Sequence, residues 1–421
     1  MRLISTILFI FLINFSIFGQ VGELIWEDNF NEGQLDLTKW TYETGTGING
    51  DWGTGQLDRA TDRIENVKFQ DGIAGSEDGC LVITTRKEFY IDRQYTSGRI
   101  NTAGKASWGP GHRIITRALP RDVKYKGQGF AFWMMPDEIP DGWDYIMWPQ
   151  GGEIDIMEYV GSIPYHNLGS VHYAWFWENN QWQEWNHGHQ GAYYSYQYEE
   201  VPNPSEPGYG GYPPSPDDPY AGSTEFHNYG IDWFFDRIEF FVDSTVYHIH
   251  YLNDGGAFQQ DGQDGFSISN STGKRVATSE YSNHFSEWYP YEHKMFAILS
   301  AGVGGGPYTY GGAIVPEAEF PCSVFIDWVK VYELDINGQF DEDVENFKFD
   351  IYPNPATDIL NIQIDNPENY TLKIINISGI TLINSSLAKT QDVDVSNLKV
   401  GTYLVLVSNG RFTMSKKLNL Q

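Results

Sequence analysis

Hydrophobic and polar residues alternate over short segments along most of the chain. The apolar, β-branched or aromatic runs are short and are separated by clusters of Gly, Pro, Asn or Asp, a pattern typical of β-strands joined by turns. No long segment has the apolar periodicity of an amphipathic helix. We therefore predict an all-β protein built as an antiparallel sandwich or barrel. The clearest predicted strands are 80–85, 129–135, 153–159, 238–242, 294–299 and 324–332.

The chain divides into a long first part and a chemically plainer tail. The last tryptophan is Trp328 and the last histidine is His293. An acidic connector, 335–348, follows, and residues 349–421 contain several further strand-like runs. We therefore predict one large β domain at 22–334, a linker, and a second, small β-sandwich domain.

The first residues have the features of a secretory signal. Met1 and Arg2 precede an apolar stretch that ends at about position 19, which gives the basic start and short apolar run of a signal peptide. Polar residues interrupt this run, so it is marginal for a membrane span of ~20 apolar residues. We expect residues 1–19 to be removed, leaving a mature protein without a stable membrane span.

The net charge of the chain excludes some classes of function. The 27 Lys and Arg stand against 56 Asp and Glu, a formal net charge of −29, which excludes electrostatic binding of nucleic acid or of an anionic membrane. Residues 349–421 contain six acidic and six basic residues, so the whole acidic excess lies upstream of them. Aromatic residues make up 16% of the chain, which is ample for a folded core and for aromatic contacts with a ligand.

The segment most informative about chemistry is 148–159, WPQGGEIDIMEY. Alternate side chains of a strand share a face, so Glu153 and Asp155 point the same way. Regular alternation would send Glu158 to the opposite face. One extra residue, most simply Met157 in a β-bulge, would return Glu158 to the side of the other two acids. We therefore predict three carboxylates on one face of this strand.

Such a row of carboxylates raises at least one pKa, because like charges repel. A retaining glycosidase needs one protonated and one ionised carboxyl group ~5–5.5 Å apart. The Cα atoms of Glu153 and Glu158 should be roughly 13 Å apart at ~3.3 Å per residue, so their side chains would have to converge across a concave, twisted strand. A solvated acidic face and a calcium-binding carboxylate cluster are the alternatives.

Tryptophans flank these acids in the sequence, and aromatic rings with polar edges suit the faces and hydroxyl groups of sugars. At these residues the chain resembles glycoside hydrolase family 16, in its laminarinase-like branch with the bulged motif E-x-D-x-x-E. The resemblance covers roughly 22–334. Its other matching segments are LIWEDNF at 24–30, LDLTKW at 35–40, RINTAGK at 99–105, YGIDW at 229–233 and FIDWVKVY at 325–332.

The resemblance implies a concanavalin A-like jelly-roll β-sandwich with a carbohydrate-binding cleft on its concave sheet. By it, Glu153 is the nucleophile, Glu158 is the general acid/base, and Asp155 orients and tunes Glu153. No cofactor is implied for the reaction. Asp327 lies where many members of the family bind a structural calcium ion, although an Asp at a strand start is often only a turn acceptor.

Four further residues are candidate substrate contacts. Trp148 resembles the cleft tryptophan of the family, and His172 resembles its substrate-contacting histidine. Trp143 and Trp175 lie near the acids in sequence and are the other two candidates. The alternatives are packed aromatic rings and a hydrogen-bonded core histidine.

Two segments depart from the laminarinase pattern. Where many glucanases have WGNNELQ this chain has WGTGQLD at 52–58, and where they have Y-G-R-I-E-x-R it has PGHRIIT at 110–116. Polar groups of this kind set sugar preference. We predict a retaining endo-hydrolase of β-linked polysaccharide, with β-1,3-glucan first and a marine galactan of agarose or porphyran type second. A non-catalytic glycan-binding protein is the third hypothesis, and the intact acids argue against it.

The tail resembles the sorting domain of the type IX secretion system, with YPNPA at 352–356, GTY at 401–403 and KK at 416–417. This implies the secretion machinery as a partner, export, and removal of the tail, so we expect a secreted or surface-attached monomer. The two cysteines, Cys80 and Cys322, would then meet an oxidising compartment, and we predict a disulfide between them.

Overall fold

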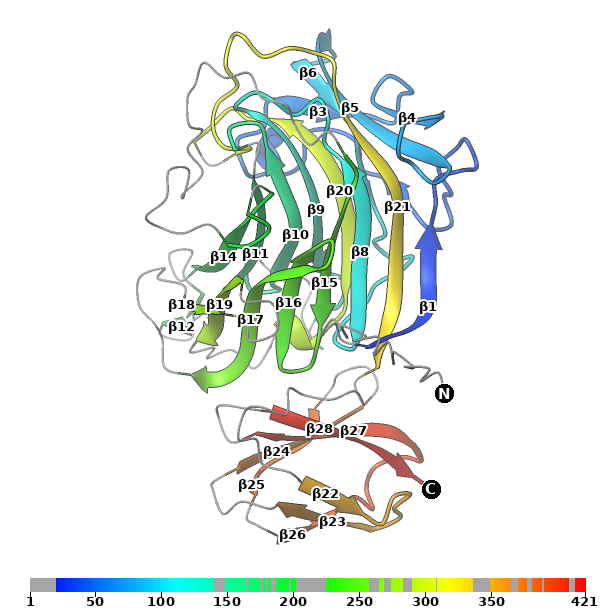
Figure 1. Ribbon diagram of the computed structural model, residues 1–421, viewed down its shortest axis with the longest axis vertical. Coiled ribbons are helices and arrows are strands. Elements are labelled where there is room, and N and C mark those ends of the chain that lie inside the picture. The colour runs from blue at the N-terminus through cyan, green and yellow to red at the C-terminus, as the bar shows by residue number, and fades with distance from the viewer. Residues whose placement is uncertain are drawn as a thin grey trace, which may run out of the picture.

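Figure 1 shows the computed structural model as two curved, stacked sheets above a smaller pair of sheets. The structure describes residues 20–139, 148–163, 166–174, 177–178, 181–182, 187–196, 198–201, 225–256, 265–268, 274–282, 290–307, 309–335, 349–364, 370–376, 381–387, 390–408 and 413–421. The predicted signal peptide and nearly all of the predicted connector lie outside these residues. No helix in the described part of the chain is long and apolar enough to cross a membrane.

One sheet of the first domain has twelve strands in the order β18-β19-β17-β16-β15-β8-β21-β5-β6-β3, with β1 beside β21 and β4 beside β5. Its pairs are antiparallel except for β17–β19 and β3–β6. The strands are β1 (Gln20–Asp28), β3 (Asp58–Ala60), β4 (Val67–Asp71), β5 (Gly79–Tyr90), β6 (Arg93–Ser97), β8 (His112–Leu119), β15 (His227–Trp233), β16 (Arg237–Val242), β17 (Thr245–Gly256), β18 (Gly265–Ile268), β19 (Arg275–Ser282) and β21 (Cys322–Asp335).

The facing sheet has seven strands in the order β14-β11-β10-β9-β20-β7-β2. They are β2 (Thr41–Tyr42), β7 (Arg99–Asn101), β9 (Gln128–Pro136), β10 (Glu153–Val160), β11 (His166–Ala174), β14 (His187–Ser195) and β20 (Met295–Val303). A two-stranded ribbon, β12 (Trp177–Glu178) and β13 (Gln181–Trp182), and two 3₁₀ turns, η1 (Ile48–Gly50) and η3 (Pro290–Glu292), complete the described elements of this domain.

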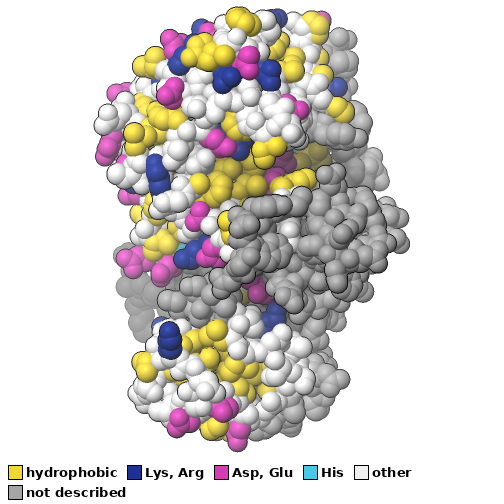
Figure 2. Space-filling model, turned by 180° about the vertical axis from the view of Figure 1, so that it is seen from behind, with side chains coloured by type: hydrophobic (Ala, Val, Ile, Leu, Met, Phe, Trp, Pro, Cys, Tyr) yellow, Lys and Arg dark blue, Asp and Glu magenta, His cyan; other side chains and the backbone are white. Residues whose placement is uncertain are grey.

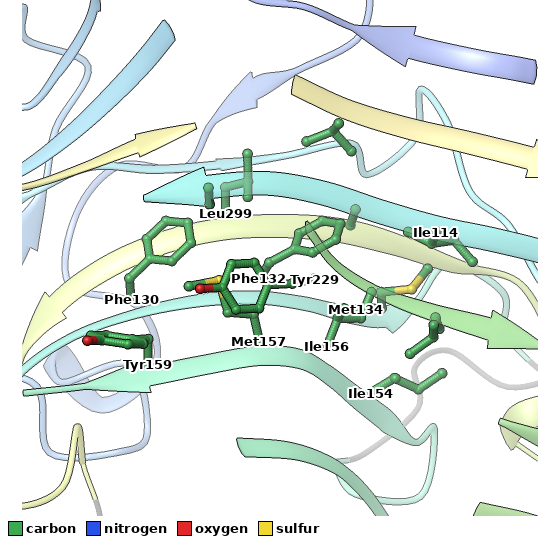
Figure 3. Close-up of a cluster of buried hydrophobic side chains, with 14 of the residues drawn as sticks. Ile114, Phe130, Phe132, Met134, Ile154, Ile156, Met157, Tyr159, Tyr229 and Leu299 are labelled. Atoms are coloured by element: carbon green, nitrogen blue, oxygen red, sulfur yellow. The ribbon is translucent and has the colours of Figure 1, made fainter. Parts of the chain in front are cut away.

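The core lies between the two sheets. Phe130, Phe132 and Met134 of β9 are fully buried at alternate positions, as period-2 alternation requires. Figure 3 shows them packed with Ile114 of β8 and Tyr229 of β15, which come from the opposite sheet. Burying one such side chain contributes about 1.5–3 kcal/mol. The same alternation turns the intervening residues of β9 and β10 toward the outer face of the seven-stranded sheet.

The tail folds as a small sandwich with a hydrophobic core of its own. One sheet contains β22 (Phe349–Tyr352), β23 (Ile359–Ile364) and β26 (Thr390–Asp394). The other has the order β25 (Thr381–Leu387), β24 (Tyr370–Asn376), β27 (Gly401–Ser408) and β28 (Thr413–Leu420). The predicted all-β class and the second, small β-sandwich are confirmed. Figure 2 shows acidic side chains scattered over one face of both domains rather than gathered in one patch.

The predicted disulfide is wrong, because Cys80 and Cys322 are both buried free thiols. Cys322 of β21 pairs with Thr85 of β5, so Cys80 is five residues, or roughly 16 Å, further along β5. A disulfide needs Cα atoms within about 7 Å. The two side chains also lie in different hydrophobic clusters: Cys322 in the core between the sheets, and Cys80 in a separate cluster with Val82 and Phe325.

Candidate active site

The predicted β-bulge is present in β10. Against β9, Asp155 pairs with Trp133 while Met157 pairs with Phe132, so the residue of β10 without a partner is Ile156 and not Met157, the residue that the sequence suggested. Ile156 and Met157 are consecutive and are both buried at about 1% exposure or less. Two successive inward side chains reset the alternation. Glu153, Asp155 and Glu158 consequently share the outer face of the sheet, as the sequence predicts.

The neighbouring strand β11 brings the three carboxylates together. Ser170 pairs with Asp155 in register, and its hydroxyl donates to Asp155 Oδ2 at 2.8 Å and lies 3.4 Å from Glu158 Oε2. His172 pairs with Glu153, and its Nε2 lies 3.2 Å from Asp155 Oδ2 and 4.0 Å from Glu153 Oε1. Two side chains of β11 therefore contact all three acids.

The segment before β10 adds a donor to the first acid. Trp148 Nε1 donates to Glu153 Oε2 at 2.7 Å, while its ring remains 45% exposed and lies 5.9 Å from the ring of His172. Gly152, which lies between Trp148 and Glu153 in the sequence, has a φ of +78°, and a Cβ at this position would approach Pro290 to 2.6 Å. Only glycine fits this left-handed, crowded position, which allows the chain to turn directly into the strand that carries Glu153.

Burial and the charge of Asp155 raise the pKa of both Glu153 and Glu158 above the ordinary value for glutamic acid. Burial alone would lower the pKa of His172, but its hydrogen bond to Asp155 and the charge of Asp155 raise the pKa to about 9. The two glutamates differ in their donors. Among the described residues, Trp148 donates to Glu153 at 2.7 Å, whereas Glu158 is contacted by the Ser170 hydroxyl at 3.4 Å. A donor favours the ionised form of its acceptor, so the Trp148 hydrogen bond opposes the upward shift in the pKa of Glu153, and the Ser170 hydroxyl opposes that of Glu158.

A cation-binding role suits these residues less well. Glu153, Asp155 and His172 place donor atoms within 4.8 Å of one another. Calcium prefers a shell of six to eight oxygen ligands, and here an imidazole lies among the carboxylates while Ser170 and Trp148 already donate to them. The calcium-cluster alternative is therefore disfavoured by the donor set.

The outer face also contains residues that the sequence reading missed. Trp133 of β9 pairs with Asp155. The Arg99 guanidinium lies 4.9 Å from the centre of the Trp133 ring and 4.4 Å from the centre of the Trp52 ring. Glu43 binds the same guanidinium at 2.6 Å. The face beside the acids is thus a stack of two indole rings around a paired arginine. Alternation along β9 could have identified Trp133, but no local pattern links Arg99 to Trp52.

Tyr310 is a second residue that the sequence does not reveal. A Cβ on Gly129 of β9 would lie 1.9 Å from the Tyr310 ring, and one on Gly302 of β20 would lie 2.5 Å from it. The ring therefore occupies space that these two glycines leave open. Gly129 and Gly302 pair directly across the sheet, beside the pair formed by Ala131 and Ser300. Tyr310 thus adds an aromatic ring on the outer side of β9 and β20.

The other sequence candidates have different outcomes. Trp148 and His172 lie at the carboxylates, whereas Trp143 and Trp175 fall outside the described residues. Asp327 is 1% exposed. Its carboxylate binds the Arg117 guanidinium and accepts from the Glu77 backbone N–H at 3.1 Å. A carboxylate satisfied by a guanidinium and an amide does not fit a calcium site, which needs oxygen ligands around a cation.

The fold and the site together define a class of protein. Two long carboxylic side chains beside a third carboxylate, on the outer face of a jelly-roll sheet and next to indole rings, are the arrangement of a two-carboxylate glycoside hydrolase.

Comparisons with known proteins agree with this class. The chain is 31% identical to a β-glucanase of Rhodothermus marinus over 74% of this chain and 85% of that protein, and 31% identical to a glucan endo-1,3-β-glucosidase of Cryptopygus antarcticus over 67% and 80%. The crystal structure of an endo-β-1,3-glucanase from Pyrococcus furiosus superposes with a TM-score of 0.51 at 27% identity, covering 76% of this chain and 97% of that one. The chain belongs to glycoside hydrolase family 16.

The tail has a match of its own. Residues 350–421 match the family model described as the secretion system C-terminal sorting domain, which agrees with the predicted type IX sorting domain. The protein is therefore a glycoside hydrolase that is secreted or carried to the cell surface.

Proposed function

We propose that the protein is a retaining endo-β-1,3-glucanase that acts as a monomer outside the cell. Glu153 is the nucleophile, Glu158 is the general acid/base, and Asp155 and His172 position Glu153. The observation that carries the proposal is the difference between the donors that contact the two glutamates, Trp148 at Glu153 and Ser170 at Glu158. Burial and the charge of Asp155 raise the pKa of both glutamates and the charge of His172 lowers both, whereas the 2.7 Å hydrogen bond from Trp148 favours the ionised form of Glu153.

In the first step, Glu158 donates its proton to the glycosidic oxygen as the bond from that oxygen to the anomeric carbon breaks. Glu153 attacks the anomeric carbon and forms a covalent glycosyl ester. Glu153 loses its negative charge in this step. The His172 imidazole lies 3.2 Å from Asp155 and its pKa is raised to about 9, so its positive charge is in position before the reaction begins.

In the second step, the ionised Glu158 removes a proton from water, which attacks the anomeric carbon and releases Glu153. Two inversions at the same carbon give net retention. The first sugar released from a β-glucan is therefore the β-anomer. Proton NMR of early products that shows the α-anomer first would contradict this mechanism.

A neutral glucan suits the charges near the site. The Arg99 guanidinium is paired with Glu43 and covered by two indole rings, so its charge is already balanced. The chain has a net charge of −29, which disfavours a heavily sulfated galactan. The relatives named above as β-1,3-glucanases also favour the glucan over the galactan alternative.

The test measures reducing-sugar release from laminarin, mixed-linkage glucan, agarose, porphyran and carrageenan. We expect laminarin to be cleaved fastest, and Glu158→Gln to lower its turnover by about 10²–10⁴-fold while binding is retained. Glu65→Gln, at an exposed glutamate, is the matched control and should leave turnover unchanged. Preferred cleavage of agarose or porphyran would favour the galactan alternative, and binding without cleavage by the parent protein would favour a glycan-binding protein.

A further inference from the structure

The outer face of the four-stranded tail sheet contains a group of large aliphatic side chains. Val405 and Val407 of β27 point into the core of the tail, so Leu404 and Leu406 point to the opposite face. Ile375 of β24 pairs directly with Leu404. These three residues, which we call the apolar strip (Ile375, Leu404 and Leu406), are only 3%, 7% and 8% exposed. Something outside the core of the tail therefore covers them.

The cover comes from the catalytic domain. Phe235, in the turn between β15 and β16, packs against the apolar strip. An ion pair lies nearby, with Lys373 Nζ of β24 at 3.4 Å from Glu292 Oε1 of η3. Figure 1 shows β24 and β27 on the side of the tail that faces the first domain. An aromatic residue and an acidic residue of one domain thus meet an aliphatic strip and a lysine of the other.

This composition is unusual for an independent small domain. The outer face of an antiparallel sandwich sheet is normally polar, because it contacts water, and adjacent large aliphatic side chains on a surface indicate an interaction site. The same outer face also carries Leu382 of β25, which is 43% exposed. The apolar strip differs from Leu382 in being covered by Phe235.

We propose that the apolar strip is a docking surface for the catalytic domain, so that the sorting tail is held against the β15–β16 turn and not left to swing freely on its connector. The connector holds both surfaces at a high effective concentration, so a small interface is sufficient for docking. While the tail is docked, the apolar strip is hidden from any other partner.

Thiol labelling of the full chain tests the proposal. A cysteine is introduced by Leu404→Cys in one variant and by Leu382→Cys in another, and the rate of reaction with a soluble maleimide is measured. The native Cys80 and Cys322 are buried, so their background is low. We expect the thiol from Leu404→Cys to react about sixfold more slowly than the thiol from Leu382→Cys, in proportion to the 7% and 43% exposure of the two positions.

Two sets of second-site variants separate docking from a general loss of structure. Phe235→Ala should bring the labelling rate of Leu404→Cys close to that of Leu382→Cys. Phe234→Ala, whose ring stacks on Arg237 at 4.1 Å, should leave that rate unchanged. Lys373→Glu should raise the rate about twofold, and adding Glu292→Lys should restore it. Equal rates for Leu404→Cys and Leu382→Cys in the parent, or no increase with Phe235→Ala in a chain of unchanged thermal stability, would overturn the proposal.

Discussion

Replacing Trp148 by phenylalanine tests whether the hydrogen bond from Trp148 favours the ionised form of Glu153. The substitution retains an aromatic ring for a sugar but removes the 2.7 Å hydrogen bond from Nε1 to Glu153 Oε2. A hydrogen bond to a charged group contributes about 1.5–3 kcal/mol. Because Trp148 is 45% exposed, the lower end of that range applies, about 1.5 kcal/mol, which corresponds to about one pKa unit.

The sign follows from the charge of the acceptor. The lost donor favours ionised Glu153, so Trp148→Phe should raise the pKa of Glu153 and move the acidic limb of the kcat/KM profile to higher pH by up to about one unit. Below that limb, kcat/KM should fall about tenfold. The assay is the pH dependence of laminarin hydrolysis.

The control is Trp133→Phe, because Trp133 Nε1 donates to Ser300 and not to an acid. This variant should leave the acidic limb in place even if KM rises. An unshifted limb in Trp148→Phe, with only KM increased, would refute the reasoning and reduce Trp148 to a sugar contact.

Three further predictions concern the pH dependence of Tm, the state of the two cysteines and the effect of a chelator. The pKa of Glu158 in the folded protein lies above its ordinary value, so its contribution to folding stability is complete below the ordinary pKa and is lost as the pH rises through the folded pKa. Glu158→Gln should therefore leave Tm unchanged at acidic pH and raise Tm in alkaline buffer. A lower Tm in alkaline buffer would contradict the assignment. Free-thiol titration of the denatured, unreduced protein should find both Cys80 and Cys322 reactive, whereas no reactive thiol would restore the disulfide. A chelator should leave Tm unchanged, because Asp327 is bound by Arg117, and a clear decrease would instead indicate a structural calcium ion.

The strands could be predicted because each depends on a local signal. The residues predicted at 153–159 fall within β10, and those at 129–135 fall within β9. The order of the strands within each sheet could not be predicted from local signals. β8 lies between β15 and β21, and this placement depends on pairs such as Ile114 with Ile231 and with Val331, which no short segment encodes.

The site also contains residues that a local pattern predicts and residues that only the tertiary structure places. Glu153, Asp155 and Glu158 lie within six residues of one strand, so alternation and one bulge place them. The disulfide prediction failed because it used compartment and cysteine number, whereas the register of β5 against β21 sets the distance between the two sulfurs. Tyr310 could not be found, because its position depends on the absence of side chains at Gly129 and Gly302.

The bulge links the packing of the sandwich to its chemistry. Ile156 and Met157 both point into the core, and without an extra residue Glu158 would point there as well. A buried, unpaired carboxylate is costly, so the segment EIDIME is compatible with this strand only in the bulged register. The apolar residues of the motif therefore select the register, and the register places the third acid beside Ser170. In this strand, the burial of two hydrophobic side chains determines which face holds the acid and base of the reaction.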